Sequence, residues 1–386
     1  MKIESSESEK KLWNDMKSIE LSLEPSSPNG LVNFTQTALK YVSSNGKSIP
    51  DSDKYIKIGE KYNMRFKLVN CNRHLLKTVL HSFGFEQCSP SNPFCNLIWV
   101  GGSVRSHVLR SLQPWQRINH FPRSSQLTRK DKLYENIARA RNQFGSLYDF
   151  IPESFVMPKD KILLSKSLQT DQFSVPYIVK PVSSSRGNGI YIIHKLSDIH
   201  SEPREVIVSR YISNPFLLNG HKFDLRLYVV VTSFHPLVAY MYYEGLTRFA
   251  CEKYTNESDE NEHPLAHLTN YSLNKHSDVF VKNLKANLED VGHKWTLGGL
   301  LRRLESEGID TQLLMLRVED LVVKSLLSVQ SPIAAACRNL VPFPSCCFEL
   351  FGFDVLIDSD LKPWLLEVNL SPSLSCTSTV RSTSMW

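Results

Sequence analysis

Hydrophobic positions in the first third of the chain follow strand and helix periods in turn. MRFKLV (64–69) alternates apolar and polar residues as a strand does, and NLIWVGG (96–102) has the apolar character of a buried strand. Between them, NRHLLKTVLHSFGF (72–85) has helical spacing and closes near Gly84. The pattern predicts a β–α–β unit within an amino-terminal lobe over residues 61–130.

A second helical pattern follows, and strands come after it. Thr128 is placed to cap a helix with apolar positions Leu133, Ile137 and Ala140, and Gly145 is placed to end it. Apolar runs bounded by turn residues then predict four strands: SFVMP, YIVKP, IYIIH and EVIVSRYI.

The remaining chain predicts a second sheet with helices. The polar residues 1–60 are interpreted as a poorly ordered leader, and residues 131–220 and 221–386 as central and carboxy-terminal lobes. The elements expected in the last lobe are strands within 220–243, a polar surface insert at 252–264, helices at 296–307 and 315–329, and closing strands at 347–358 and 362–370.

Composition narrows the class of protein. At 386 residues, with 41% hydrophobic and 22% charged residues, the chain is long enough for two or three packed lobes of a soluble protein. It contains no apolar run long enough for a membrane span, and its start, MKIESSESEKKLWNDMK, lacks the apolar core of a signal peptide. We therefore expect an intracellular, cytoplasmic protein.

Cysteine and charge patterns exclude further classes. The eight cysteines form no CxxC pair and no zinc-finger spacing, so we expect reduced, mostly buried thiols and no cysteine metal site. The basic residues behind the net charge of +6 are spread along the chain. This distribution favours a charged cleft for an acidic partner, and no motif supports nucleic-acid binding.

The two closing strands carry the strongest chemical signal. They flank the turn-rich SDLK, which predicts an antiparallel hairpin with Asp354 roughly opposite Glu367. Alternation places Asn369 beside Glu367, with Trp364, Leu366 and Val368 on the other face. Two carboxylates and a carboxamide suit Mg²⁺. The alternative is a solvated polar face of an edge hairpin.

Three further segments present charge or backbone groups. YIVKPVSSSRGNGIYII places Lys180, Arg186, Gly187 and Gly189 around a loop that can cover polyphosphate, although such a loop is also a common hairpin turn. EVIVSRYISNP has a strand edge suited to a planar base, with Ile207 and Ile212 against the ring; the alternative is a core strand. Lys222, Asp224 and Arg226 alternate on one face of HKFDLRLYVVV, which indicates a ligand or a structural ion-pair ladder.

Polar residues near the middle of the last lobe suggest a small-ligand site. Arg248 stands among apolar and aromatic residues, and Asn270, Tyr271 and Ser272 form a hydrogen-bonding cluster. Lys294 lies beside a tryptophan, where composition alone favours an ordinary surface lysine.

Seven segments, in order over residues 61–375, together resemble the tubulin-tyrosine-ligase-like enzymes, and within them the polyglutamylases that modify α-tubulin. They are FPRSSQLTRKD, KP…SRGNGI, KFDLRLYVVVTS, YEGLTRFA, HLTNYSLNK, FELFGFDVLID and KPWLLEVNLSPSL. The resemblance implies an α/β (α+β) ATP-grasp fold whose amino-terminal, central and carboxy-terminal lobes enclose ATP.

The resemblance also implies roles for individual residues. The expected nucleotide contacts are Lys180, Arg186, Gly187, Ser209, Arg210, Tyr211, Ile212, Lys222, Phe223, Asp224, Thr269 and Asn270. The expected magnesium ligands are Asp354, Glu367 and Asn369, and the expected contacts of free L-glutamate are Arg248, Tyr271, Ser272, Lys294 and Glu367. Arg186 is also expected to meet the protein substrate, and Glu367 and Arg226 are the catalytic candidates.

The implied reaction is ATP-dependent ligation of free glutamate to glutamate side chains of acidic tubulin tails, through an acyl phosphate. A monomeric protein on microtubules, at a cilium or basal body, is expected, with no nucleic-acid or membrane partner. After LEVNLSPSL the family pattern continues with an acidic residue and further helices, whereas this chain reads SCTSTVRSTSMW, which we interpret as an alternative or truncated ending. The alternatives are a ligase for glycine or tyrosine, and a catalytically weak isoform that only binds tubulin or a partner.

Overall fold

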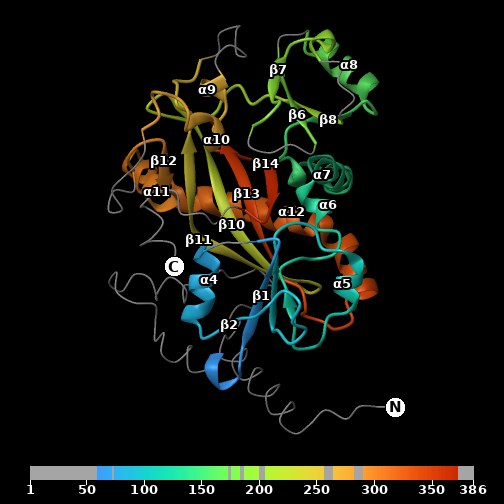
Figure 1. Ribbon diagram of the computed structural model, residues 1–386. Helices are drawn as coiled ribbons and strands as arrows, with labels where there is room; N and C mark the ends of the chain where they lie inside the picture. Colours follow the sequence, from blue (N-terminus) through green and yellow to red (C-terminus); the bar gives the residue numbers. More distant parts are fainter. Residues whose placement is uncertain are drawn as a thin grey trace. The chain divides into compact units, whose positions relative to one another are not determined.

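Mixed sheets and helices make up the described part of the chain (Figure 1). The computed structural model describes residues 59–71, 74–172, 175–182, 187–199, 205–255, 264–281 and 290–372. All of them belong to one compact unit, and their mixture of sheet and helix confirms the α+β class. Most of the expected leader, the centre of the polar insert, Arg186 and the last residues from 373 onward lie outside the described residues.

The first sheet is parallel and has the order β2-β1-β3-β4. Alternate residues of β1 are buried, and Phe66 and Leu68 pack against Leu76 of α4, which confirms the β–α–β prediction. The elements of this region are β1 (Arg65–Val69), α4 (His74–Ser82), β2 (Glu86–Gln87), β3 (Leu97–Val100), α5 (Ser106–Arg110) and β4 (Arg117–Ile118).

The second sheet is antiparallel, in the order β5-β8-β6-β7. On β6, Tyr177 and Val179 face the helix α8 and pack in one hydrophobic core, while Ile178 and Lys180 point to the opposite face. The sequence predicted all four strands. Their bounds are β5 (Ser154–Met157), β6 (Tyr177–Pro181), β7 (Tyr191–Ile193) and β8 (Val206–Arg210), with α8 (Lys161–Thr170) and the 3₁₀ turn η2 (Leu196–Asp198) between them.

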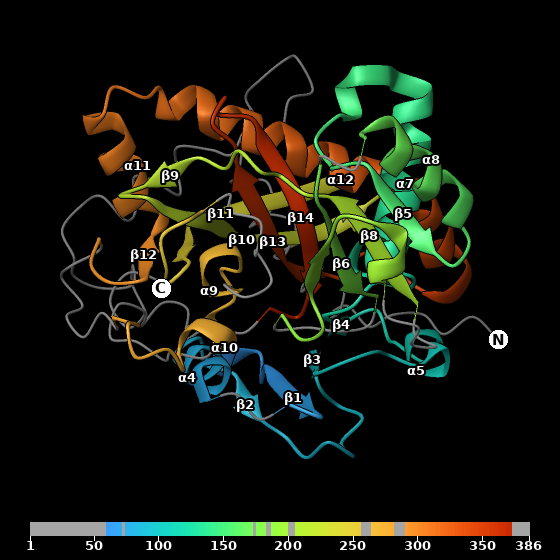
Figure 2. The ribbon, with the colours of Figure 1, turned by 90° about the horizontal axis from the view of Figure 1, so that it is seen from above.

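The third sheet is the largest, in the order β12-β11-β10-β13-β14, with the short β9 also paired to β10. Figure 2 shows α11 and α12 along one side of this sheet and α9 on the other. The elements are β9 (Leu217–Leu218), β10 (His221–Phe234), β11 (Leu237–Phe249), α9 (Pro264–His267), α10 (Tyr271–Asn274), β12 (Lys294–Thr296), α11 (Leu297–Ser306), α12 (Thr311–Leu340), β13 (Glu349–Ile357) and β14 (Pro363–Leu370).

One helix boundary differs from the sequence prediction. α7 (Lys130–Phe144) buries Leu133, Ile137 and Ala140 and ends at Gly145, whose φ is 62°, as predicted. Thr128 does not cap it, because this residue belongs to the preceding α6 (Ser125–Thr128) and its hydroxyl donates to the Ser124 carbonyl. Residues Gly145–Tyr148 continue as the 3₁₀ turn η1.

The helix predicted at 315–329 is twice as long in the structure. Its amino-terminus is fixed by Asp310, whose side chain accepts a hydrogen bond from the Leu313 amide at 2.9 Å. Pro332 lies inside the helix without ending it, and Ile333 and Ala336, which follow it, are buried.

Two neighbouring leucines of α12 allow a matched test of this packing. Leu326 is fully buried, whereas Leu327 is 44% exposed. We expect Leu326→Ala to lower the free energy of unfolding by about 2–4 kcal/mol, because it leaves a cavity in the core. Leu327→Ala should change it by less than about 0.5 kcal/mol. Urea unfolding of both variants measures this difference, and equal destabilisation would contradict the packing.

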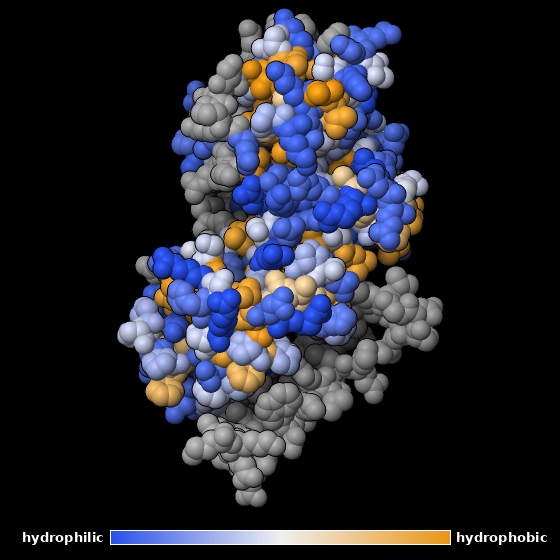
Figure 3. All heavy atoms as spheres, turned by 90° about the vertical axis from the view of Figure 1, so that its right-hand side faces the viewer, coloured by the Kyte–Doolittle hydropathy of each residue, from blue (hydrophilic) through white to orange (hydrophobic). Residues whose placement is uncertain are grey.

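The surface and thiols are those of an ordinary globular protein. Hydrophilic side chains cover most of the face that carries α5, α7 and α8, with scattered hydrophobic patches (Figure 3). No helix in the described ranges is both long and apolar enough to cross a membrane. The cysteines of these ranges are free thiols, and Cys95, Cys251, Cys346 and Cys347 are buried, as expected.

Candidate functional site

A pocket lies against the second and third sheets and collects most of the predicted site residues. It encloses about 890 Å³ of space, a figure that includes open solvent. The predicted residues that line it are Lys180, Gly187, Ser209, Arg210, Tyr211, Ile212, Lys222, Asp224, Arg248, Thr269, Asn270, Asp354 and Glu367.

Four charged side chains form a network, and three of them, Asp224, Arg248 and Asp354, line this pocket. Arg226 and Asp354 are opposite each other on β10 and β13, and Asp224 is opposite Arg248 on β11. An Arg226 terminal nitrogen lies 2.9 Å from Asp354 Oδ2, and a second ion pair joins Arg248 to the same oxygen at 2.9 Å. Arg248 Nε also donates to Asp224 Oδ1 at 2.8 Å. Of the three residues considered for an ion-pair ladder, Asp224 and Arg226 belong to this network, whereas Lys222 donates to the Tyr211 hydroxyl.

The network sets the ionisation of its central carboxyl group. Burial would raise the pKa of Asp354, but Arg226 and Arg248 outweigh it and hold that pKa well below its usual range. Burial raises the pKa of Asp224. Arg248 opposes this effect only in part, because Asp224 shares this arginine with Asp354. Asp354 is thus ionised although its side chain is buried.

The closing hairpin is confirmed, with one correction. Asp354 is paired with Glu367 in the register, as predicted. Strict alternation along β14 is wrong, because a bulge inserts Leu366 between the paired positions. Leu365 and Val368 therefore face the core, whereas Leu366 turns to the pocket beside Glu367.

The third oxygen-bearing side chain of the hairpin lies next to the first. Asn369 Nδ2 is 3.3 Å from Asp354 Oδ2 and 3.3 Å from the Gly352 carbonyl oxygen. The described residues contain no group of three His, Cys, Asp or Glu side chains arranged for a metal. The candidate metal ligands are thus two carboxylates and one carboxamide.

Two segments meet at the pocket: the loop that contains Gly187 and the start of α10 at Asn270. Gly187 has a φ of 81°, and a Cβ at this position would lie 2.6 Å from Leu273 Cδ1 and 3.0 Å from Asn270 Oδ1. The loop therefore approaches the start of α10 at a distance that only glycine permits. Gly187 and Asn270 both line the pocket, as Lys180 does.

The apolar lining differs from the prediction in two places. Ile207 is fully buried in the main core and does not line the pocket, whereas Ile212 does. The buried Ile178 and Leu356 are also part of the apolar lining, together with Pro152, Pro181, Ile190, Leu268 and Leu366. The Phe223 side chain is also in the core, packed against Phe216 and Phe249, so only its backbone is near the site.

Three predicted residues lie at the edge of this pocket rather than in its lining. Lys294 of β12 is paired with Arg248 in the sheet register. Its ammonium lies 5.4 Å from the ring centre of Tyr271, the first residue of α10, and Ser272 follows in that helix. Lys294 is therefore held beside an arginine and an aromatic ring, not on an open surface.

Comparison with known proteins decides the family. The sequence profile of the tubulin-tyrosine ligase family matches residues 109–385. The chain belongs to the tubulin-tyrosine ligase family. It is 50% identical to tubulin polyglutamylase ttll-5 of Caenorhabditis elegans, over 89% of this chain and 48% of that protein. It is 47% identical to human tubulin polyglutamylase TTLL5, over 83% of this chain and 25% of that protein.

A third relative has a different printed activity. Human tubulin monoglutamylase TTLL4 is 37% identical over 82% of this chain and 26% of its own length. This member of the tubulin-tyrosine ligase family thus spans between a quarter and a half of the length of these curated relatives.

Within this family member, one charged pocket residue that contacts a candidate metal ligand was not predicted from the sequence. Lys130 lines the pocket from the first turn of α7, and its ammonium lies 3.0 Å from Glu367 Oε2. A cation at a helix amino-terminus opposes the helix dipole, and this unfavourable position in LTRKD was the available signal.

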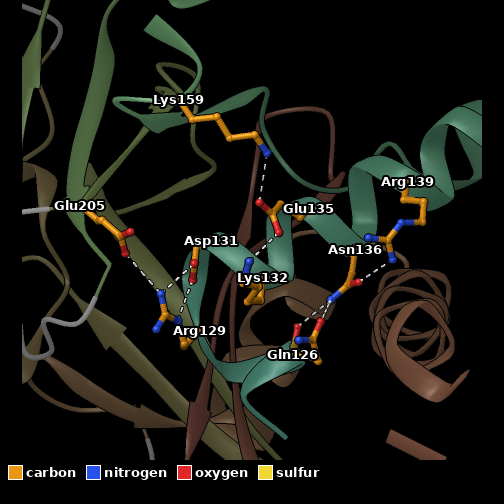
Figure 4. A network of polar contacts seen from close by, with 9 residues as sticks. All are labelled: Gln126, Arg129, Asp131, Lys132, Glu135, Asn136, Arg139, Lys159 and Glu205. Carbon is orange, nitrogen blue, oxygen red and sulfur yellow. Dashed lines mark hydrogen bonds and ion pairs between the residues drawn. The ribbon is translucent and has the colours of Figure 1, made fainter. Parts of the chain in front are cut away.

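Neighbouring ion pairs hold that first turn in place. Arg129 makes a bidentate contact to Asp131 at 3.0 and 2.8 Å and also lies 3.4 Å from Glu205 (Figure 4). Farther along α7, Lys159 pairs with Glu135 at 3.3 Å. These contacts tie α7 to the second sheet and so orient Lys130 toward Glu367.

Proposed function

We propose that this chain carries the ligase activity of a tubulin polyglutamylase on an ATP-grasp fold with lobes over 61–130, 131–220 and 221–386. The observation that carries the proposal is the hairpin site, where Asp354 and Glu367 face each other and are each met by cations of the pocket. Membership of the tubulin-tyrosine ligase family, with relatives named tubulin polyglutamylases, supports it.

The pocket divides into regions suited to the parts of ATP. Lys180 and Gly187, with Arg186, hold the phosphates, and Ser209–Ile212 present the strand edge to adenine. Lys222, Asp224, Thr269 and Asn270, with the Phe223 backbone, complete the nucleotide site.

The donor set of the hairpin fits magnesium. Asp354, Glu367 and Asn369 supply oxygen ligands but too few of them for an octahedron. This fits an ion that takes its other ligands from phosphate oxygens and water. Bound there with ATP, magnesium would neutralise phosphate charge. Asp354 would be one of the residues that hold the ion, and its contacts with Arg226 and Arg248 fix the position of this carboxylate.

The residues of the chain act mainly by position and charge. A tail carboxylate oxygen takes up the γ-phosphoryl group of ATP, releasing ADP and forming an acyl phosphate. The α-amine of free glutamate then attacks the acyl carbon, phosphate leaves, and the amine loses its proton. Arg226 and Lys130 provide fixed positive charge where negative charge develops, and their ion pairs keep them in place before the reaction.

Glutamate is favoured over glycine or tyrosine by the charges at the pocket edge. Arg248 and Lys294 are neighbours on β11 and β12, which provides two cations for the two carboxylates of glutamate, with Tyr271 and Ser272 beside them. Glycine and tyrosine each have one carboxylate. Competition among labelled amino acids distinguishes these substrates.

The expected partner is tubulin, with α-tubulin tails favoured. The net charge of +6 suits an acidic tail. The chain acts as a monomer on cytoplasmic microtubules, including those of cilia and basal bodies.

A tail-dependence assay tests the proposal. Purified protein with ATP, Mg²⁺ and labelled glutamate should label intact tubulin. Tubulin from which the tails have been removed by limited proteolysis should take up at least about 100-fold less label, because the acceptor carboxylates lie in the tails and positioning supplies most of the rate. Equal labelling of both, or a preference for labelled glycine, would contradict the proposal.

A further inference from the structure

A chain of hydrogen bonds runs along the buried wall of the pocket through three elements. The Lys222 ammonium, on β10, donates to the Tyr211 hydroxyl at 2.9 Å. That hydroxyl lies 2.7 Å from Nδ1 of His267, the last residue of α9. All three side chains line the pocket, and each residue is at most 6% exposed.

A lysine ammonium only donates, so the Tyr211 oxygen accepts the hydrogen bond from Lys222. When the His267 ring is neutral with its proton on Nε2, its Nδ1 accepts the Tyr211 proton, and the chain then has one direction. A protonated ring would donate from both nitrogens and leave the Tyr211 proton without that acceptor, beside two cations.

Aromatic rings restrain the same lysine from other sides. The Lys222 ammonium lies 4.4 Å from the ring centre of Tyr211 and 5.6 Å from that of Tyr254. His267 packs edge-to-face against both rings, with centroid distances of 5.9 Å to Tyr211 and 5.2 Å to Tyr254. Lys222 is thus ordered before any ligand arrives, which reduces the entropy lost on binding.

We propose that Tyr211 and His267 are positioning residues that hold the Lys222 ammonium toward an anionic nucleotide in the pocket. This inference rests on the proposed function, which supplies ATP as the ligand. It assigns to the Tyr211 hydroxyl a role distinct from the backbone contact with adenine, and it adds His267 to the site.

Two substitutions separate positioning from packing. Tyr211→Phe keeps the ring but removes the hydroxyl, and His267→Ala removes the acceptor. We expect each to weaken Mg²⁺-ATP binding about tenfold, measured by isothermal titration calorimetry. Tyr211→Phe loses a buried hydrogen bond to a charged group, and His267→Ala loses the partner that orients the Tyr211 hydroxyl. His267→Asn, whose amide oxygen lies near the position of Nδ1, should recover most of that affinity.

Kinetics provide a readout that a purely structural role would not move. The KM for ATP should rise about tenfold in Tyr211→Phe, while kcat changes by less than about twofold, because the ground state and transition state lose the same contact. A lower kcat at unchanged KM would indicate loss of folded enzyme and would overturn the inference. Tyr240→Phe, at a residue that is 56% exposed on β11, is the control and should bind ATP as the wild type does.

The outcomes distinguish this inference from the proposed function. If the wild type binds Mg²⁺-ATP and Tyr211→Phe and His267→Ala bind it equally well, the positioning role is wrong and the proposed function stands. If His267→Asn is as weak as His267→Ala, the acceptor role of Nδ1 is wrong. If the wild type does not bind Mg²⁺-ATP, the proposed function fails and this inference fails with it.

Discussion

Asp354→Asn is expected to lower the free energy of unfolding by about 3–5 kcal/mol, because it leaves a buried positive charge without its counter-ion. In the wild type, Arg226 and Arg248 both contact Asp354, and only Asp224 would remain to balance them. Asparagine has nearly the same shape as aspartate, so the loss reports charge rather than packing. Urea unfolding at pH 7 measures it.

The pH dependence of this difference follows from the lowered pKa of Asp354. Burial would raise that pKa, but Arg226 and Arg248 lower it by more. A carboxyl group whose folded pKa lies below its unfolded value stabilises the protein above the unfolded value, about 3.9, and loses that stabilisation as pH falls further. The gap between wild type and Asp354→Asn should therefore stay constant from pH 7 to about pH 5.

Two further variants test the cause. Asp320→Asn removes an exposed partner of Lys324 on α12 and should cost less than about 0.5 kcal/mol. Adding Arg226→Met to Asp354→Asn should recover part of the lost stability, because it removes one unpaired cation. If the double variant is as unstable as the sum of its single changes, charge imbalance is not the cause.

Glu367→Gln should reduce glutamate incorporation by about 100-fold or more while leaving the fold intact. The change removes a charged candidate magnesium ligand and the partner of Lys130, and losses of this size are usual even for groups behind a metal ligand. Its effect on stability should stay near 1 kcal/mol or below, since the Glu367 side chain is 26% exposed. Initial rates with tubulin and labelled glutamate measure the activity.

A second measurement separates metal binding from other causes. The Mg²⁺ concentration needed for tight ATP binding should rise in Glu367→Gln. The control is Glu307→Gln, which removes an exposed partner of Arg303 and should leave both rate and Mg²⁺ dependence unchanged. Wild-type incorporation by Glu367→Gln would exclude Glu367 as a catalytic residue.

The sequence predicted the parts of this site that depend on short-range periodicity. The pairing of Asp354 with Glu367 followed from two alternating strands around a four-residue turn. The charged face of β10 followed in the same way, and burial required a partner for Asp224 and Arg226. The sequence did not identify those partners, because they depend on which strands lie beside β10 in the sheet.

Three features required the folded chain. The bulge at Leu366 depends on how β14 fits β13, and a single inserted residue changes which side chains face the core. Ile207 and Ile212 look alike in the sequence, yet Ile207 lies within β8 and is buried in the core, whereas Ile212 follows the strand and lines the pocket. Lys130 contacts Glu367 from a helix more than two hundred residues earlier in the chain. A local sequence pattern does not predict a contact over such a separation.

The placement of the pocket walls also affects how the protein withstands degradation. β6 carries Lys180 on the face opposite a small hydrophobic core of its own, while β10 and β13 carry Asp224 and Asp354 above the main core. A nucleotide bound to both walls would act as a reversible cross-link between two cores. At a concentration one hundred times its Kd, it would add about 2.7 kcal/mol to the folded state. The cellular ATP concentration would then affect the lifetime of the protein as well as its rate of ligation. Without bound ATP the chain unfolds more often, and proteases cleave the unfolded state.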